Sequence, residues 1–564
     1  MLRQTHLALT LLAVLPLQAQ TSQSASPQPP APDAIYYHGS ILTGVDLTTP
    51  HPQRVTALAV ANGKVLSSGT DADTLKLKGP QTKLINLAGA FALPGLNDAH
   101  VHLGSGGRQK LAVDLTGSTS LADMQSRIHA AAAKAPPGTW LQGGGWDHTL
   151  WASKQLPTRA DIDSITAGHP AFFVRVDGHI AIANTAALAA AGITAQTPDP
   201  QGGKFDHDAL GGLTGIVREG TAMAMMTKVI PPPSLELRRK ALALAIQDAL
   251  SHGLTSVQDN SDWQDFLAVE ELENNGQLHL RISEWLAFDQ PTDVLKSRRA
   301  SHPADDVLLH TGMLKGFMDG SLGSRTAAMN DAYSDDPGNS GIPRYDQQKL
   351  NLMAAERALA GFQLGFHAIG DRAATMALNA FQAAEQVAPD GSKSRFRIEH
   401  AQVIDAADFD RFATLGVIAS MQPNHLLTDM NWAAQRLGPD RVKYSYAWKT
   451  FLDHHIVLAF GTDYPVEPIT PYRGIYSAVT RMDEAGTQTY QPQEKLTIGQ
   501  ALYAYTQGSA FAEKRETIKG QLLPGYLADF TVLDRDLTTI PAADILKTQV
   551  LRTVVGGETV YQKP

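Results

Sequence analysis

The sequence predicts an α/β fold: a (β/α)8 TIM-like barrel with a small β-sandwich formed by both termini and an insertion after the first barrel strand. Three observations support this prediction. Apolar runs of strand length alternate with helical patterns through the middle of the chain. Strand-like segments occur near both ends, and a long stretch, about residues 104–228, separates the first barrel strand from the second. That stretch is too long for a barrel loop and predicts an inserted subdomain.

Eight strand-like runs account for the predicted barrel. Two of them cover residues 253–257 and 279–286, and the others end at His100, Lys315, His367, His400, Met421 and Asp463. Helical spacing at 237–250 and 372–387 lies between such runs. Repeated strand-then-helix units indicate parallel strands, and eight of them suffice to close a barrel.

The two ends of the chain predict the β-sandwich. Short apolar runs at 35–38, 57–60 and 83–87 include Asn62-Gly63, a strong hairpin signal. A similar pattern returns at 529–534 and 550–561. We therefore assign 34–92 and 516–564 to the sandwich and 93–515 to the barrel.

Composition excludes several classes of function. The net charge of −9 is spread along the chain without a basic cluster, which argues against nucleic acid as a partner. The chain has no cysteine, so disulfides, thiolate catalysis and cysteine-ligated metals are excluded. Nothing in the sequence specifies an oligomeric state.

The first residues predict export. Arg3 precedes an apolar run at 7–17, and Ala19 is a small residue at a cleavage position, so residues 1–20 read as a signal peptide. The apolar run is too short to span a bilayer, so no stable membrane insertion is expected. The Ser/Gln/Pro-rich segment 21–33 predicts a disordered spacer. We expect an exported protein, periplasmic or secreted.

Metal-ligating residue types recur at the predicted strand ends. His100 and His102 lie two apart on a strand, so both imidazoles can face one point. The carboxyl ends of barrel strands converge on one mouth, which would add the side chains of His367, His400 and Asp463. Singly, each has a structural explanation, as a packed histidine or a turn aspartate. Their coincidence at successive strand ends predicts a metal site.

This mixture of nitrogen and oxygen donors suits one or two divalent metal ions, with Zn²⁺ preferred and Mn²⁺, Ni²⁺ or Co²⁺ as alternatives. Protein ligands can leave one position for water, whose pKa the metal lowers towards about 7. Asp463 is then placed to act as the catalytic base.

The motifs resemble those of the amidohydrolase superfamily, within it the family-3 branch that includes N-substituted formamide deformylases. The similarity is carried by residues 94–102, 315–326, 367–371, 398–402, 461–465 and 520–534. The resemblance implies a metal-dependent barrel in which Lys315 joins the metal ligands. It also implies that a carboxylated Lys315 bridges two metals, whereas unmodified Lys315 implies a single metal.

Further residues are candidates for substrate binding. His425 follows the seventh strand, and Arg325 lies in a glycine-rich loop where it can bind a carboxylate or carbonyl oxygen. Trp146 and His179, both in the insert, are candidates to line a lid, although core packing explains the tryptophan equally well. Strand alternation predicts that Glu399 points away from the mouth and is structural. Asp371 is interpreted as a helix cap rather than a residue supporting the metal ligands.

These observations favour a metal-dependent amidohydrolase acting on carbon–nitrogen bonds other than peptide bonds, in a small amide such as an N-formyl or N-acyl amine. One alternative keeps the metal but cleaves an ester or a cyclic imide. Another is a catalytically inactive periplasmic protein that binds metal or solute. Asp463 speaks against the last, because capture alone needs no proton shuttle.

Overall fold

The computed structural model describes residues 31–176, 178–302, 306–388 and 394–564. The predicted signal peptide and most of the predicted spacer lie outside the described residues. Within these ranges no helix is long and apolar enough to cross a membrane.

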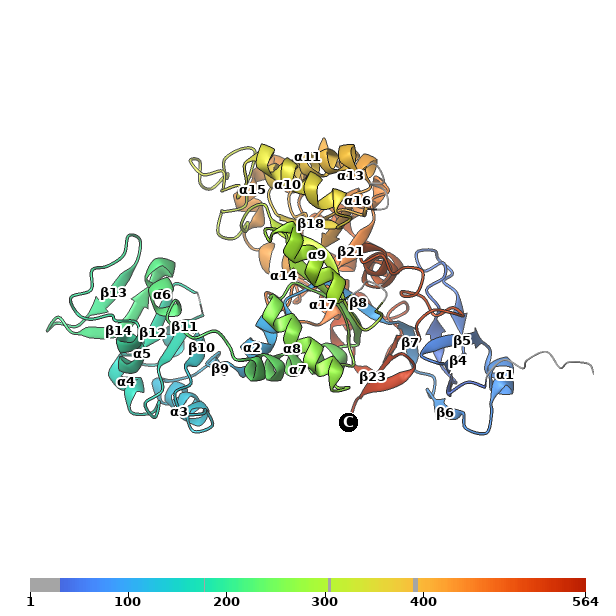
Figure 1. Cartoon of the computed structure of the whole chain (residues 1–564), viewed down its shortest axis with the longest axis horizontal. Coiled ribbons are helices and arrows are strands. Elements are labelled where there is room, and N and C mark those ends of the chain that lie inside the picture. The colour runs from blue at the N-terminus through green and yellow to red at the C-terminus, as the bar shows by residue number, and fades with distance from the viewer. Residues whose placement is uncertain (1–30, 177, 303–305, 389–393) are drawn as a thin grey trace, which may run out of the picture.

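Eight parallel strands form a nearly closed barrel at the centre of the molecule, which confirms the predicted fold (Figure 1). The chain order of the strands is also their order around the barrel, and a parallel bridge between Val101 and Tyr464 joins the first strand to the segment after the last. The strands are β8 Leu96–Val101, β15 Leu254–Asp259, β16 Arg281–Ala287, β17 Leu309–Phe317, β18 Leu364–Ala368, β19 Arg397–His400, β20 Ile418–Met421 and β21 Leu458–Phe460.

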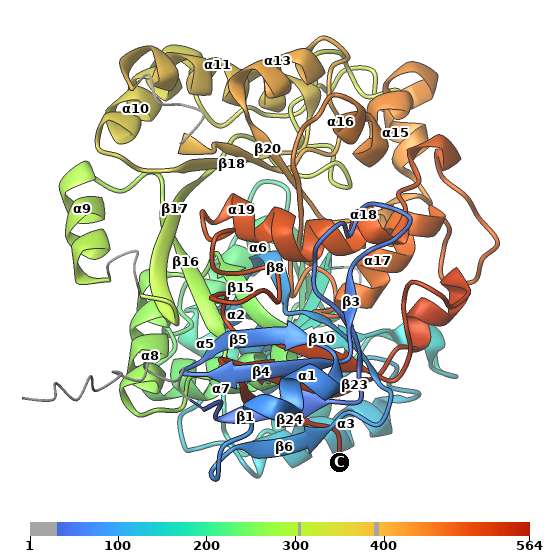
Figure 2. The same cartoon turned by 90° about the vertical axis from the view of Figure 1, so that its right-hand side faces the viewer.

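Helices cover the outside of the barrel (Figure 2). Both helices predicted by spacing are present, and the first begins where the Ser234 hydroxyl accepts a hydrogen bond from the Leu237 amide. The helices of the barrel region are α2 Leu103–Leu111, α7 Leu235–Ser251, α8 Trp263–Asn274, α9 Thr292–Ser301, α10 Gln347–Leu359, α11 Asp371–Val387, α13 Asp408–Leu415, α14 His425–Asp429, α15 Ala433–Arg441, α16 Trp448–Asp453, α17 Pro471–Thr480, α18 Ile498–Tyr503 and α19 Ser509–Ala512.

Strands from both ends of the chain share one six-stranded sheet, in the order β24-β23-β22-β7-β2-β3, beside a four-stranded sheet, β5-β4-β1-β6. Asn62 and Gly63 form the predicted two-residue turn, both with positive φ. The strands are β1 Ala34–Tyr37, β2 Ser40–Leu42, β3 Arg54–Val55, β4 Ala57–Ala61, β5 Lys64–Gly69, β6 Lys83–Asn86, β7 Phe91–Pro94, β22 Phe530–Leu533, β23 Val550–Val555 and β24 Glu558–Gln562; the short helix α1 is Asp71–Thr74.

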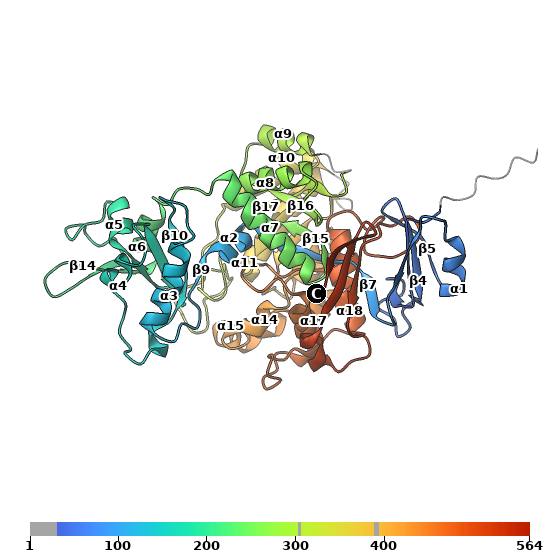
Figure 3. The ribbon, with the colours of Figure 1, turned by 90° about the horizontal axis from the view of Figure 1, so that it is seen from below.

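The insert stands on one side of the barrel, opposite the four-stranded sheet (Figures 1 and 3). It has hydrophobic clusters of its own, as a separate subdomain requires. Its sheet has the order β13-β14-β12-β11-β10-β9. Its elements are β9 Val113–Asp114, α3 Leu121–Ala132, β10 Leu141–Trp146, α4 Arg159–Asp163, β11 Ala171–Arg175, β12 Ile180–Ala183, α5 Thr185–Ala190, β13 Lys204–His207, β14 Leu213–Arg218 and α6 Glu219–Thr227.

Two buried carboxyl groups face each other on neighbouring barrel strands. Asp259 Oδ1 accepts hydrogen bonds from the Leu103 amide and the Ser261 hydroxyl. Asp259 Oδ2 and both carboxyl oxygens of its register partner Glu284 have no hydrogen-bond partner among the described residues. Burial, reinforced by the charge of Asp259, raises the pKa of Glu284 well above its usual range. The pair is therefore satisfied when Glu284 carries a proton and donates it to Asp259.

We expect Glu284→Gln to stabilise the protein increasingly as pH rises. Above the unfolded-state pKa of about 4.3, this carboxyl is ionised in the unfolded protein but still protonated in the folded protein. The free energy of unfolding therefore falls as pH rises, until pH reaches the raised folded-state pKa. Glutamine keeps a donor for Asp259 and removes the titration. Melting temperatures measured from pH 5 to 8.5 should show a variant-minus-wild-type difference that grows with pH. The exposed Glu236→Gln is the control, and a pH-independent difference for Glu284→Gln would contradict the assignment.

Candidate metal centre

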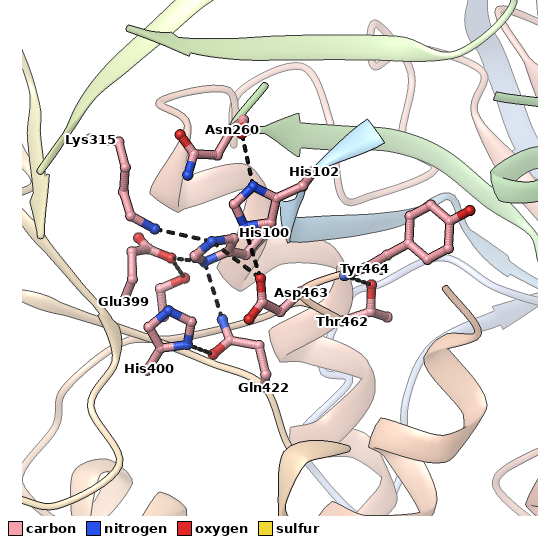
Figure 4. Close-up of polar contacts among 12 residues, drawn as sticks. His100, His102, Asn260, Lys315, Glu399, His400, Gln422, Thr462, Asp463 and Tyr464 are labelled. Atoms are coloured by element: carbon pink, nitrogen blue, oxygen red, sulfur yellow. Dashed lines mark hydrogen bonds and ion pairs between the residues drawn. The ribbon is translucent and has the colours of Figure 1, made fainter. Parts of the chain in front are cut away.

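A cavity of about 360 Å³ lies at the carboxyl ends of the barrel strands. It brings together six residues that the sequence analysis placed at strand ends, and Figure 4 labels all of them except His367. They come from five places in the barrel, β8 and the residue after it, β17, β18, β19 and the turn after β21, and are His100, His102, Lys315, His367, His400 and Asp463. The barrel thus gathers side chains that are far apart in sequence around one space.

The two histidines of β8 are each held through Nδ1. His100 Nδ1 donates to the Glu399 carboxylate at 2.8 Å, and His102 Nδ1 donates to the Asn260 carbonyl oxygen at 2.8 Å. Burial lowers the pKa of His100 to about 3, aided by the nearby Lys315, so its ring is neutral. With the proton on Nδ1, the lone pair of each ring lies on Nε2 and faces the cavity.

Asp463 completes a set of converging donors. Its Oδ1 lies 3.1 Å from His102 Nε2 and 3.6 Å from His100 Nε2. When the His100 and His102 rings carry a proton only on Nδ1, three acceptor atoms point at one another, an arrangement that a cation between them would stabilise. The residues therefore fit a divalent metal held by His100, His102 and Asp463, one of two convergent groups among the described residues.

The second group combines His400, His425 and Asp463. His400 Nδ1 donates to Gln422 Oε1 at 2.7 Å, which leaves its Nε2 lone pair for the cavity. His425 has the opposite arrangement, because its Nδ1 accepts a hydrogen bond from the Gln402 amide at 3.3 Å. Its Nε2 therefore carries the proton and lies 3.4 Å from Asp463 Oδ2. His425 is placed to donate a hydrogen bond rather than to ligate a metal.

Lys315 and His367 line the cavity but belong to neither convergent group. Lys315 Nζ lies 3.0 Å from His100 Nε2, and burial lowers the pKa of this lysine to about 8. His367 Nε2 donates to the Gly320 carbonyl oxygen at 2.9 Å, so its lone pair is on Nδ1. Both can add donors to the site: the lysine in its neutral form and the histidine through Nδ1.

Glu399 is absent from the cavity lining, but the expectation that it is only structural is wrong, because it holds the candidate ligand His100. The carboxylate is buried in the barrel, where it contacts His100 and the Arg397 guanidinium, at 2.8 Å each. Strand alternation fails here because His400 has a φ of 74° and the following Ala401 a φ of 44°. This left-handed turn brings His400 to the same interior as Glu399. Although burial opposes ionisation, Arg397 lowers the pKa of Glu399 to about 2.

The candidate substrate-binding residues separate into two groups. His425 lines the cavity, whereas the lining does not include Arg325, which pairs with Asp335 at 2.7 Å. Trp146 is fully buried in the insert, where its Nε1 donates to the Phe173 carbonyl oxygen. His179, also in the insert, pairs with Glu219 at 3.0 Å.

Other residues that support the site were not singled out from the sequence. Gln422 lies in the same motif as His425, a signal that could have identified it. Asp98 accepts hydrogen bonds from the Thr462 amide and hydroxyl and from the His100 amide, so it ties β8 to the turn that carries Asp463. The interpretation of Asp371 as the helix cap is wrong, because Gly370 occupies the N-cap position of α11 and Asp371 is its first residue, whose carboxylate accepts from the Asn330 amide.

A parallel barrel whose strand ends present histidines and an aspartate around one cavity defines a metal-dependent hydrolase. The family model for the amidohydrolase family matches residues 83–561. The chain belongs to this family, and it is an enzyme that hydrolyses amides or similar bonds.

Curated relatives match along nearly the whole chain. Protein LONG AFTER FAR-RED 3 of Arabidopsis thaliana is 34% identical and covers 94% of this chain and 91% of its own. The candidate amidohydrolase YtcJ of Bacillus subtilis (strain 168) is 33% identical, over 94% of this chain and 99% of its own. N-substituted formamide deformylase of Arthrobacter pascens is 25% identical, and the match covers 90% of this chain and 95% of the deformylase.

Solved structures show the same architecture. An uncharacterized metal-dependent hydrolase from Pyrococcus furiosus superposes with a TM-score of 0.76 at 29% identity, covering 90% of this chain and all of its own. An uncharacterized metal-dependent hydrolase from Pyrococcus horikoshii OT3 gives a TM-score of 0.75 at 28% identity, and the match covers 90% of this chain and 99% of that protein.

We expect Glu399→Gln to weaken metal binding about 10- to 100-fold, because His100 loses an anionic acceptor that orients it and raises its basicity. Metal titration of the chelator-treated protein, followed by calorimetry, measures the effect. Circular dichroism checks that Arg397, left without its anionic partner, has not unfolded the barrel.

Ser420→Ala is the matched control, because it removes a 2.8 Å hydrogen bond to Glu399 but leaves the carboxylate on His100. Its effect should be smaller. Wild-type metal affinity in a folded Glu399→Gln protein would contradict the role assigned to the carboxylate.

Proposed function

We propose that the protein hydrolyses a carbon–nitrogen bond other than a peptide bond, in a small N-formyl or N-acyl amine, with zinc as its metal. The observation that carries this proposal is Asp463, whose two oxygens face different partners. Oδ1 faces the β8 histidines and Oδ2 faces His425, so one carboxylate adjoins both the metal position and a proton donor. The name of the deformylase relative supports this class of substrate.

One metal would be held by His100, His102 and Asp463. A second metal would be held by His400 and His367. Such a metal supplies Lewis acidity, which polarises the substrate carbonyl and makes a water acidic enough to attack near neutral pH. A carbamate on Lys315 would add an anionic oxygen donor to this site, and we propose that Lys315 carries one. Burial supports this proposal, because only the neutral amine captures CO2 and the pKa of Lys315 is lowered to about 8.

The chain's own groups handle the proton. Asp463 takes it from the attacking water at Oδ2 and passes it to the leaving nitrogen, as a general base and then a general acid. His425 Nε2–H donates to the same oxygen or to the substrate carbonyl oxygen. Burial alone would lower the pKa of His425, but the adjacent Asp463 raises it, which keeps the donor proton in place near neutral pH.

Asp463→Asn should lower kcat about 10²- to 10⁴-fold on the best amide substrate, because the base is lost while one oxygen donor remains. The assay is a panel of N-formyl and N-acyl amines, esters and cyclic imides with metal-reconstituted protein, and metal content is measured in parallel. Faster turnover of esters or imides than of any amide would overturn the proposed bond type. Wild-type kcat in the variant would overturn the role of Asp463.

Lys315→Ala should act through metal binding instead. We expect the metal count to fall towards one per chain, with partial rescue of activity by a short carboxylic acid and excess metal. Elemental analysis of the purified variant measures the count. Two metals and full activity in this variant would rule out the proposed carbamate.

We also propose that the protein is exported, on the basis of the charged, apolar and small-residue pattern of residues 1–20. The mature protein should begin near Gln20 or Thr21, as determined by N-terminal sequencing of the exported fraction. Leu12→Arg, which interrupts the apolar run, is the control and should block export. Met1 at the start of exported protein would contradict the proposal.

A further inference from the structure

Part of the cavity lining is apolar, and it reaches the histidines, because Phe317 lies beside the His367 ring with 5.5 Å between the ring centroids. We call it the apolar wall, and it consists of Phe317, Leu322, Gly323, Ile369, Trp432 and Val466. Val466 is 68% exposed and marks the rim, whereas Leu322 is fully buried. The metal chemistry proposed above uses none of these side chains, so the wall needs another explanation.

Arg436 of α15 builds this wall from two separate segments. Its guanidinium donates to the carbonyl oxygens of Leu322 at 3.0 Å and Gly323 at 2.7 Å. It also stacks on the Trp432 ring, 4.4 Å from the centroid. The loop after β17 and the start of α15 are thereby clamped against each other with their apolar groups towards the cavity. Such a clamp adds to the packing of Trp432 against the hydrophobic core in holding the ring in place.

The carboxylates beside the wall already have partners. Glu467 contacts the Arg473 guanidinium at 2.6 Å and accepts from the Thr428 hydroxyl at 2.9 Å. Asp429 accepts a hydrogen bond from the Tyr446 hydroxyl at 2.6 Å. Neither needs a cationic ligand to complete its hydrogen bonding. The wall therefore favours an uncharged group over an ammonium group.

Gly323 sets the space in front of Trp432. A Cβ at this position would lie 3.5 Å from the edge of the Trp432 ring, in ordinary van der Waals contact. The backbone of Gly323 does not have the left-handed φ that would require glycine. A larger side chain is therefore compatible with the loop and would occupy space at the edge of the Trp432 ring, reducing the room beside it.

We propose that the apolar wall binds an uncharged apolar substituent of the substrate, such as an aryl or branched alkyl group on the amide, and that Gly323 limits its size. This inference rests on the proposed function and adds the substrate class. The cavity of about 360 Å³ accommodates one such group together with the amide itself. Arg436 is a positioning residue, because it acts on the substituent only through Leu322, Gly323 and Trp432.

The test compares three formamides on metal-loaded full-length protein: N-(2-phenylethyl)formamide, N-methylformamide and the cationic N-(2-aminoethyl)formamide. The wild type should prefer the phenylethyl compound about tenfold or more in kcat/KM, as expected for burial of an aryl group. Gly323→Leu should reduce that preference at least tenfold. Gly323→Ala should have an intermediate effect.

Gly220→Leu is the matched control, because Gly220 lies in the insert, has open space around it and also lacks a left-handed φ. It should leave the preference unchanged. Arg436→Lys should raise KM for the phenylethyl compound more than it lowers kcat, which a loss of overall stability would not do.

Calorimetric binding separates this inference from the proposed function. If no formamide is hydrolysed but N-(2-phenylethyl)formamide binds and Gly323→Leu abolishes its advantage, the wall assignment stands and the reaction is wrong. The wall assignment is wrong if formamides are hydrolysed but Gly323→Leu lowers kcat/KM equally for all three compounds. It is also wrong if the variant keeps the preference for the phenylethyl compound. Tighter binding of the cationic compound than of the phenylethyl compound would also overturn it.

Discussion

The site depends on a carboxylate buried inside the barrel. Glu399 has no exposure to solvent, and an unpaired charge there would be prohibitively expensive. Arg397 and Ser420 supply the compensating hydrogen bonds, both at 2.8 Å, and the remaining contact goes to His100 Nδ1. The orientation of His100, the first candidate metal ligand, therefore follows from how the barrel satisfies one buried anion. The other candidate ligands are arranged around that ring.

One backbone feature and one side chain bring the candidate ligands His400 and Asp463 to His100. The left-handed residues His400 and Ala401 rotate the end of β19 so that His400 joins Glu399 in the interior. Asp98 ties the turn after β21 to β8 through both its oxygens, which sets Asp463 next to the β8 histidines. Both features strain or desolvate the chain locally, and such costs are common where a structure must hold reactive groups in fixed positions.

Periodicity in the sequence was sufficient for the barrel, because strands buried on both faces and amphipathic helices differ in repeat length. It also placed the metal-ligating types at strand ends, since parallel strands converge there. It could not place Glu399, because alternation assumes extended backbone and His400 is not extended. Nor could it distinguish packing from function for Trp146, which the structure places in the core of the insert, or find the Asp335 partner of Arg325.

The loop after β17 links the metal centre to the apolar wall. Asp319 anchors it, since the carboxylate accepts hydrogen bonds from the amides of Ala328, Ile369 and Gly370. The next residue, Gly320, supplies the carbonyl oxygen that fixes the tautomer of His367. Leu322 and Gly323 follow and form part of the wall.

One anchored loop thus orients a candidate ligand at its start and shapes the substrate space three residues later. Substitutions beyond Gly320 can change the wall without moving His367, because the carboxylate of Asp319 holds the loop ahead of them. This separation allows the substrate range to change while the chemistry of the site is retained.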